Sequence, residues 1–254
     1  MKFFYTLIVL IIYSNFVQSR NLGETEITAE EGIEVFQDEK YYLLKKNVII
    51  DSDNFKLRGD KIKIYFQNDL YDIKKIDAFG NVNLNSDQFG ILADGDKLIF
   101  IVKTEEIFIS GKNSKLINKN TEMYSDGEIR VNNLSGDFFI EGKNSSLKAK
   151  DIYILSHSIN GVFSLVDDNN DISVLNVFDN NIAYVKTEST EMYAKNISYS
   201  NEKSLIELKN QVKVIRDGEI ITGDHGTLNT NNNSYKVRSN DKEKVKVIIK
   251  NTDE

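Results

Sequence analysis

The sequence predicts an all-β protein built from antiparallel strands that are joined by short polar turns. Apolar and polar residues alternate in many short runs, for example in residues 61–66, KIKIYF. A period of two residues is typical of a strand with one buried and one wet face. Turn-forming residues such as Gln67, Asn68 and Asp69 separate these runs. We expect no helix of appreciable length after Ser19.

The segment 57–84 shows the unit most clearly. Its first arm carries Ile62, Ile64 and Phe66 on one parity, and its second arm, 76–84, again places apolar residues on one parity. The Gly80–Asn81 step inside that second arm predicts a bulge or a tight bend. The unit is therefore a strand, a polar turn and a second strand that share one apolar face.

Related units recur along the chain. Each return has an apolar residue, a small residue, an Asp or related polar residue, and then an alternating apolar run. The polar positions that mark these returns are Asp60, Asp94, Asp126, Asp151, Asn196 and Asp224. A loose period of roughly 30 residues predicts a repeat architecture in which each unit buries its face against its neighbours. We interpret the marker residues as bend formers that bind nearby backbone groups, because short polar side chains favour that role.

Several other turns follow from local composition. Residues 37–39, QDE, separate two apolar runs near the start of the predicted strands. Residues 112–114, 143–145 and 230–234 are rich in Asn, Ser and Lys and are predicted to form hairpin-type turns. The last alternating run, 243–250, reads EKVKVIIK and predicts a terminal strand.

Composition excludes several classes of function. The 254 residues include 32 Lys and Arg and 39 Asp and Glu, which gives a net charge of -7. An acidic chain is not expected to bind nucleic acid or to adhere electrostatically to anionic membranes. The chain has no cysteine, which excludes disulfides and thiolate metal sites.

The first 19 residues have the features of a secretory signal. Lys2 provides a positive charge, residues 3–13 form an apolar run, and residues 17–19, VQS, resemble a cleavage site after Ser19. We therefore expect a mature protein outside the cytoplasm, with a single β domain over residues 20–254. The alternative is an uncleaved membrane anchor, although Ser14 and Asn15 interrupt the apolar run short of a full membrane span.

Residues with catalytic or metal-binding chemistry are sparse. His157 and His225 are the two histidines, and neither has partners at metal-ligand spacing. The acidic run 167–171, DDNND, lacks the Gly and the distal Glu of a calcium-binding EF-hand loop. We expect no catalytic residue, no metal site and no cofactor, and hence a protein that is not an enzyme.

The shared apolar face is the remaining candidate for function. It forms either the packed core of a two-layer β protein or an apolar groove that admits acyl chains. The residues predicted to form it are Val48, Ile50, Ile62, Ile64, Phe66, Val82, Leu84, Leu98, Phe100, Ile107, Ile109, Ile129, Val131, Ile152, Ile154, Val212 and Val214.

Four segments resemble the OstA-like repeats of periplasmic lipopolysaccharide-transport proteins of the LptA type. They are residues 33–50, IEVFQDEKYYLLKKNVII; 76–84, IDAFGNVNL; 91–100, ILADGDKLIF; and 123–131, MYSDGEIRV. The resemblance extends over most of residues 27–230. Each motif is degenerate, so the recurrence of the motif after a signal-like segment carries the resemblance.

The resemblance implies a twisted, V-shaped β-jellyroll that is open at both ends. It implies that lipopolysaccharide slides with its acyl chains between the sheets and its sugars outside, from the inner to the outer membrane. It also implies partners that add at the sheet edges: the inner-membrane and outer-membrane components of the transport machinery, and further copies of the chain head to tail. The lysine-bearing run 243–250 and the edge 32–36, which carries Glu34, are the ends that would pair.

Two alternatives remain from the sequence. If the N-terminal apolar segment is retained, the chain would be a membrane-anchored partner in the same transport system. From a different class, a secreted parallel β-helix would serve as an adhesin or as a polysaccharide-cleaving enzyme, although the hairpin-type turns favour antiparallel pairing.

Overall fold

A computed structural model describes residues 22–68, 72–88, 90–165, 171–240 and 244–249. These parts of the chain form 18 β-strands and one 3₁₀ turn, η1 (Val102–Thr104), and contain no α-helix. The all-β prediction is confirmed. The predicted signal, with its cleavage point after Ser19, lies outside the described residues, as do most of the acidic run 167–171 and the last residues of the chain.

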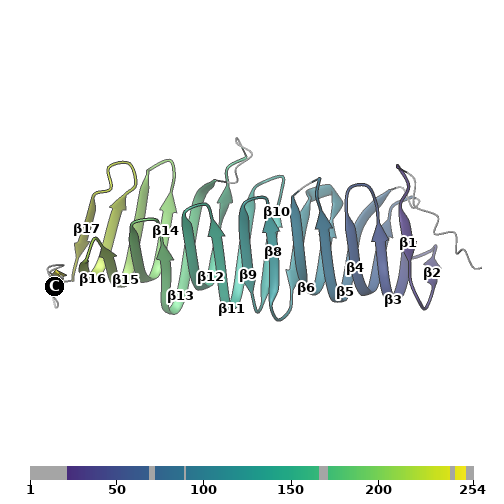
Figure 1. The fold of residues 1–254 in the computed structure, drawn as a ribbon, viewed down its shortest axis with the longest axis horizontal. Helices are drawn as coiled ribbons and strands as arrows, with labels where there is room; N and C mark the ends of the chain where they lie inside the picture. Colours follow the sequence, from purple (N-terminus) through teal and green to yellow (C-terminus); the bar gives the residue numbers. More distant parts are fainter. Residues whose placement is uncertain (1–21, 69–71, 89, 166–170, 241–243, 250–254) are drawn as a thin grey trace, which may run out of the picture.

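The strands follow one another along the long axis of the molecule in sequence order (Figure 1). Their bounds are β1 (Glu26–Thr28), β2 (Ile33–Phe36), β3 (Tyr41–Asp51), β4 (Lys56–Phe66), β5 (Ile73–Ser86), β6 (Ile91–Ile101), β7 (Glu106–Ser110), β8 (Ser114–Asn118), β9 (Thr121–Ser125), β10 (Glu128–Asn132), β11 (Asp137–Ala149), β12 (Ile152–Phe163), β13 (Ile172–Lys186), β14 (Thr190–Ser200), β15 (Leu205–Arg216), β16 (Glu219–Asn229), β17 (Tyr235–Arg238) and β18 (Lys246–Ile249).

Every pairing between the described strands is antiparallel. The parallel β-helix alternative is therefore wrong, and with it the form of adhesin or polysaccharide-cleaving enzyme that depended on it. The physical reason is visible in the turns: polar connections of two to five residues, such as 37–40 and 230–234, reverse the chain directly, whereas parallel pairing needs a long crossover.

The strands make two layers that face each other. The long strands β3 to β6 and β11 to β16 bend in the middle, so that one half of each lies in each layer. Pairing places the short strands β1, β8, β9 and β18 in a first layer and β2, β7, β10 and β17 in a second layer. The fold is thus a sheet folded along a line of bends, with its apolar face inside.

The bends are made by residues with unusual backbone conformations. In β5 the pairing shifts register between Phe79 and Val82, and Gly80 and Asn81 both have positive φ, at 70° and 47°. The predicted bulge at Gly80–Asn81 is confirmed. A Cβ atom at Gly80 would collide with the Asp60 carboxylate, so glycine is required both for its φ and for space. Similar pairs of positive-φ residues occur at positions 46–47 of β3 and 210–211 of β15.

Four of the marker aspartates accept hydrogen bonds at this line of bends. Asn81 Nδ2 donates to Asp60 Oδ2 at 2.9 Å, and Asn144 Nδ2 donates to Asp126 Oδ2 at 2.8 Å. The backbone N–H of Asn240 donates to Asp224 at 2.8 Å. The interpretation as bend formers that bind nearby backbone groups is confirmed for Asp224 and for Asp126, which also accepts from the backbone N–H of Asn113 at 3.2 Å. Asp60 and Asp94 instead accept from the side chains of Asn81 and Asn83. Asp151 is an exception, because it lies in the turn between β11 and β12 and not at a bend.

Two of the predicted hairpin turns are wrong. Residues 143–145 lie inside β11, where the pairing shifts between Glu141 and Ser145. The predicted turn at 112–114 is the end of the connection from β7 in the second layer to β8 in the first, with Ser114 already in β8, and these two strands are not paired with each other. Asn and Gly adopt positive φ as readily in a bend as in a chain reversal. The turns at 37–39 and 230–234 do reverse the chain and are confirmed.

The centre of the molecule is closed. Strands β6, β7, β10, β11, β9 and β8 each pair with the next, and β8 pairs back with β6, so six strands form a ring. The resemblance implied an open V-shaped jellyroll with an apolar groove between its sheets. In the described structure the layers instead pack on each other here around Ile109, Ile129 and Ile140, which have no exposed surface.

Candidate functional site

All 17 residues of the predicted apolar face lie between the two layers. Leu84, Phe100 and Ile152 are partly buried and pack against the core, and the other 14 are buried within it. The alternation of side chains thus identified the inner face. Whether these residues bind lipid stays a prediction, because most of them are packed against other side chains in this conformation.

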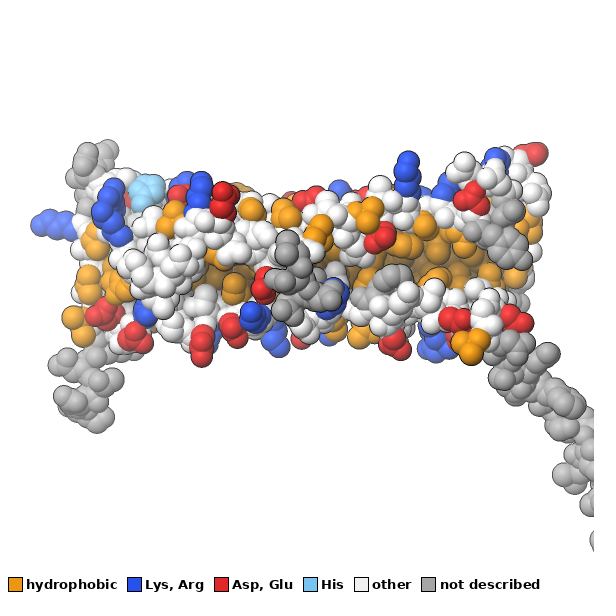
Figure 2. All heavy atoms as spheres, turned by 90° about the horizontal axis from the view of Figure 1, so that it is seen from above, with side chains coloured by type: hydrophobic (Ala, Val, Ile, Leu, Met, Phe, Trp, Pro, Cys, Tyr) orange, Lys and Arg blue, Asp and Glu red, His pale blue; other side chains and the backbone are white. Residues whose placement is uncertain are grey.

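Opposite the bends, two rows of turns, one from each layer, form what we call the mouth. One rim is made by first-layer connections, those of β3–β4, β5–β6, β8–β9, β11–β12, β13–β14 and β15–β16. The other is made by second-layer connections, those of β2–β3, β4–β5, β6–β7, β10–β11, β12–β13, β14–β15 and β16–β17. Figure 2 views this side and shows hydrophobic side chains in a recess between the rims. The recess is widest toward the N-terminal end of the molecule.

An apolar cavity of about 270 Å³ occupies this N-terminal part of the mouth. Apolar side chains from both layers line it: Phe55, Leu57, Ile76, Leu84, Ile91, Leu98, Phe100, Val102 and Ile107. Polar residues border it, namely Asn54, Ser86, Glu105 and Asn133. The arrangement is an apolar slot with polar edges, which suits a slim hydrocarbon chain with a polar end.

Sequence reasoning identified four members of this cavity, Leu84, Leu98, Phe100 and Ile107. It missed Leu57 and Ile91, which begin the repeated motif ahead of Asp60 and Asp94. Their position three residues before each marker is a signal that could have found them. The bend shifts the parity of the inner face, which is odd-numbered before Asp60 and Asp94 and even-numbered after them. The remaining predicted residues lie deeper in the core or farther along it.

The middle of the mouth is polar. A recess of about 260 Å³ lies between residues 120–121 and 149–152 of the first layer and Asp171, Tyr199 and Asn201 of the second. The Lys150 ammonium and the Asp171 carboxylate form an ion pair across it at 3.6 Å. Burial, and next the negative charge of Asp171, raise the pKa of Tyr199. Ala149, Ile152 and Ile172 are the aliphatic residues in its lining, so this part is more polar than the N-terminal cavity.

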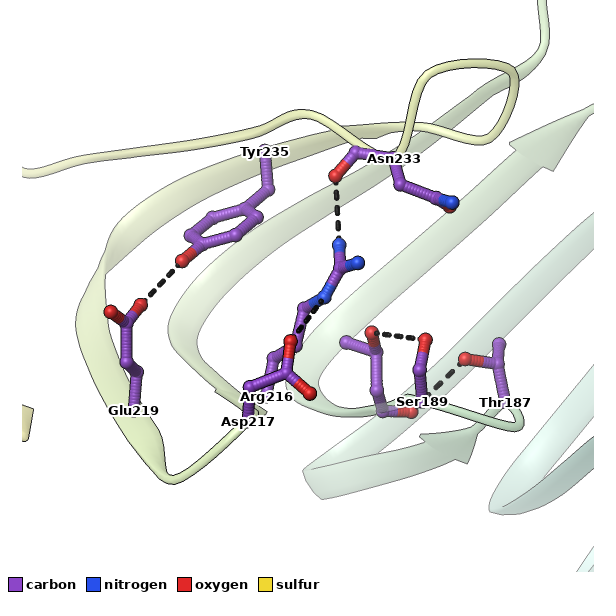
Figure 3. Close-up of polar contacts among 8 residues, drawn as sticks. Thr187, Ser189, Arg216, Asp217, Glu219, Asn233 and Tyr235 are labelled. Carbon is purple, nitrogen blue, oxygen red and sulfur yellow. Dashed lines mark hydrogen bonds and ion pairs between the residues drawn. The ribbon is translucent and has the colours of Figure 1, made fainter. Parts of the chain in front are cut away.

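The C-terminal end of the mouth is closed by hydrogen bonds between the layers (Figure 3). Arg216 Nη1 donates to the backbone oxygen of Asn233 at 2.8 Å. The Tyr235 hydroxyl donates to Glu219 Oε2 at 2.7 Å, and this bond, together with burial, raises the pKa of Tyr235. The character of the mouth therefore changes along the molecule from apolar and open to polar and closed.

Both histidines are exposed and lie near the line of bends. The backbone N–H of His157 donates to Asp179 Oδ2 at 2.8 Å. Within the described residues, no group of three or more His, Asp or Glu side chains is arranged to hold a metal ion. Nor does that part of the chain include a helix long and apolar enough to cross a membrane.

Two short edge strands lie at each end of the folded sheet. At the N-terminal end, β2 exposes Ile33 and Val35, which are 50% and 47% exposed. At the C-terminal end, β18 is exposed along its whole length and carries Val247, Ile248 and Ile249. Glu34, the predicted partner for the C-terminal lysines, already forms an ion pair with Lys45 at 2.6 Å. Charge pairing through Glu34 would thus have to compete with this contact.

No family model matches the chain, and no curated protein matches it in sequence. Among solved structures, it matches LptH from Pseudomonas aeruginosa, the LptA-homologous periplasmic component of the conserved lipopolysaccharide transport device. The match has a TM-score of 0.23 and 9% sequence identity, and it covers 90% of this chain and 96% of LptH. At that TM-score we infer neither fold nor function from the likeness.

Proposed function

We propose that the protein is a periplasmic carrier that holds acyl chains of lipopolysaccharide between its two layers on their way from the inner to the outer membrane. The observation that carries the proposal is the apolar cavity at the mouth, which draws its lining from both layers and is bordered by polar residues. The substrate class comes from the resemblance of the repeated segments to OstA-like repeats. The signal-like N-terminal segment supplies the compartment.

The physical basis is the burial of hydrocarbon. Each methylene removed from water contributes about 0.8 kcal/mol, and the lining residues Leu84, Leu98 and Phe100 offer an apolar surface to receive it. The polar border, with Asn54 and Glu105, keeps a hydrated head group at the surface, since burying unpaired polar groups is costly. At about 270 Å³ the cavity is slightly smaller than ordinary ligand pockets, which span about 300–1,000 Å³. It therefore fits part of one chain until the layers separate further.

The proposal also includes association through the sheet ends. β2 and β18 are exposed edge strands with apolar side chains, and unpaired strand edges accept a strand from another chain. Copies of the chain, or domains of membrane components of the transport system, would add there and extend the apolar interior from one to the next. Energy for movement would come from a separate ATPase, so this function needs no catalytic residue in this chain.

The test is the binding of purified lipopolysaccharide compared with the same molecule after removal of its acyl chains. We expect the intact molecule to bind and the deacylated one, which keeps its sugars and phosphates, to bind at least tenfold more weakly. A free long-chain fatty acid should compete with the intact molecule. Equal binding of the intact and deacylated molecules would refute an apolar site and would point to recognition of sugars on the outer surface.

A further inference from the structure

Two hydrogen bonds join the layers at the C-terminal end of the mouth, and both involve the edge of the second layer. Arg216 in β15 reaches the β16–β17 turn at Asn233, and Tyr235 in β17 reaches Glu219 in β16. Figure 3 shows the two bonds one beside the other, bridging the strands. We call these four residues the latch.

The interior beneath the latch is apolar, and the latch covers it on the side of the mouth. Inner-face residues continue to the C-terminal end, where Leu208, Val212 and Val214 are buried in the same core as the lining of the cavity. An acyl chain that moves along the interior would have to reach these residues beneath the latch. The C-terminal end of the mouth thus carries polar groups, namely the Arg216 guanidinium, the Glu219 carboxylate and the Tyr235 phenol. The N-terminal part of the mouth is lined mainly by apolar side chains.

The second-layer half of the latch lies on a part of the fold that is held weakly. β17 has four residues, it pairs with one strand, β16, and its other edge has no partner among the described strands. Interior strands of this sheet pair on both sides over about twice that length or more. Local opening requires fewer contacts to break at such an edge than in the interior of the sheet.

We propose that Arg216, Glu219, Asn233 and Tyr235 form a gate that holds the two layers together at the C-terminal end of the mouth and keeps acyl chains out of the groove beneath it until the gate opens. The proposal rests on the proposed function of the groove. It assigns these residues a role in the direction and extent of lipid movement, beyond the stability that any hydrogen bond supplies.

The chain offers a clean test of gate opening because it contains no cysteine. Cysteines introduced at the exposed positions Glu188 and Asn231, one on each rim, would carry spin labels for distance measurement in the full-length protein. The variant Arg216→Met with Tyr235→Phe removes both bonds and keeps most of the apolar side-chain atoms. We expect its distance distribution to lengthen and broaden relative to the parent.

The matched control is Thr187→Val. It removes the hydrogen bond from Thr187 Oγ1 to the backbone oxygen of Thr190, at 3.3 Å, which lies within one rim and joins no layers. We expect the control to leave the distance unchanged. The same distance in the double variant and in the parent would overturn the gate.

A photoreactive long-chain fatty acid provides the lipid readout, with labelled peptides mapped by mass spectrometry. In the parent we expect labelling around Phe100 and little around Leu208 and Val214; in the double variant, labelling around these two positions should rise at least several-fold. An unchanged pattern despite an opened mouth would overturn the gate. Absence of labelling in every variant would instead refute the proposed function, while the spin-label distances would still report on the latch.

Discussion

The substitution Leu84→Asn tests the apolar cavity directly. Leu84 lines the cavity from β5 and is only partly buried, so the free protein can hydrate a polar side chain there. A bound acyl chain would cover that side chain and leave its amide without partners. An unsatisfied buried amide costs about 1–3 kcal/mol, and the lost apolar contact adds to this cost. At 1.4 kcal/mol for each factor of ten, we expect fatty acid binding to weaken by about 10- to 100-fold.

Leu92→Asn is the matched control, because it makes the same chemical change on the opposite face. Leu92 lies on the neighbouring strand β6, points outward and is 43% exposed. Titration of a fluorescent long-chain fatty acid would measure both variants, with thermal unfolding as the check on folding. We expect Leu92→Asn to bind within twofold of the parent. If the two variants bind equally well, or if both lose binding equally, the cavity is not the site.

Three further outcomes follow from the structure. Ile129→Ala should lower the free energy of unfolding by about 2–5 kcal/mol in urea titrations, because Ile129 has no exposed surface in the centre of the six-strand ring. Ile99→Ala, on the outer face of β6, should lower it much less. Similar decreases in the two variants would contradict the packed centre. Hydrogen bonds from Asn144 and from the backbone of Asn113 hold the pKa of Asp126 below its usual range. That carboxylate therefore stabilises the fold above its unfolded-state pKa of about 4 and loses this effect as the pH falls through its lower folded-state value. The stability gap between the parent and Asp126→Asn should accordingly narrow in acid unfolding series below about pH 4, and a gap that widens there would contradict this role. Deletion of residues 244–254 removes the exposed strand β18 and should weaken self-association in light scattering; unchanged association would exclude this end as a docking edge.

The inner face could be predicted because it depends on a local rule. Side chains alternate across a strand, so Ile62, Ile64 and Phe66 share a face wherever the strand is placed. Likewise, Gly80–Asn81 predicts an irregular backbone because positive φ is accessible to these residue types. Both features are confirmed by the register of β4 and β5 and by the φ values.

Features that depend on pairing partners could not be predicted in the same way. Residues 143–145 have the composition of a chain reversal, yet the strand continues through them, because β12 pairs with β11 on both sides of the bend. The ring of six strands arises from the pairing of β8 with β6 and of β7 with β10. No periodicity within one segment contains that information.

The latch illustrates a third limit. Arg216 and Asn233 are 17 positions apart, and both are polar residues beside turns, where solvent exposure is the ordinary expectation. Their contact depends on the distance between the two layers, which is set by the volume of core side chains beneath them. The apolar lining at Leu57 and Ile91, in contrast, carried a sequence signal in its place at the start of each repeat.

The most direct test of the central claim is site-specific photocrosslinking to lipopolysaccharide at two neighbouring positions of β6. Phe100 lines the cavity, whereas Ile99 belongs to the outer surface of the same strand. A photoreactive residue at position 100 should give a lipopolysaccharide adduct, and the same residue at position 99 should give at least tenfold less. Equal adducts at both positions, or adducts at position 99 alone, would contradict a groove between the layers.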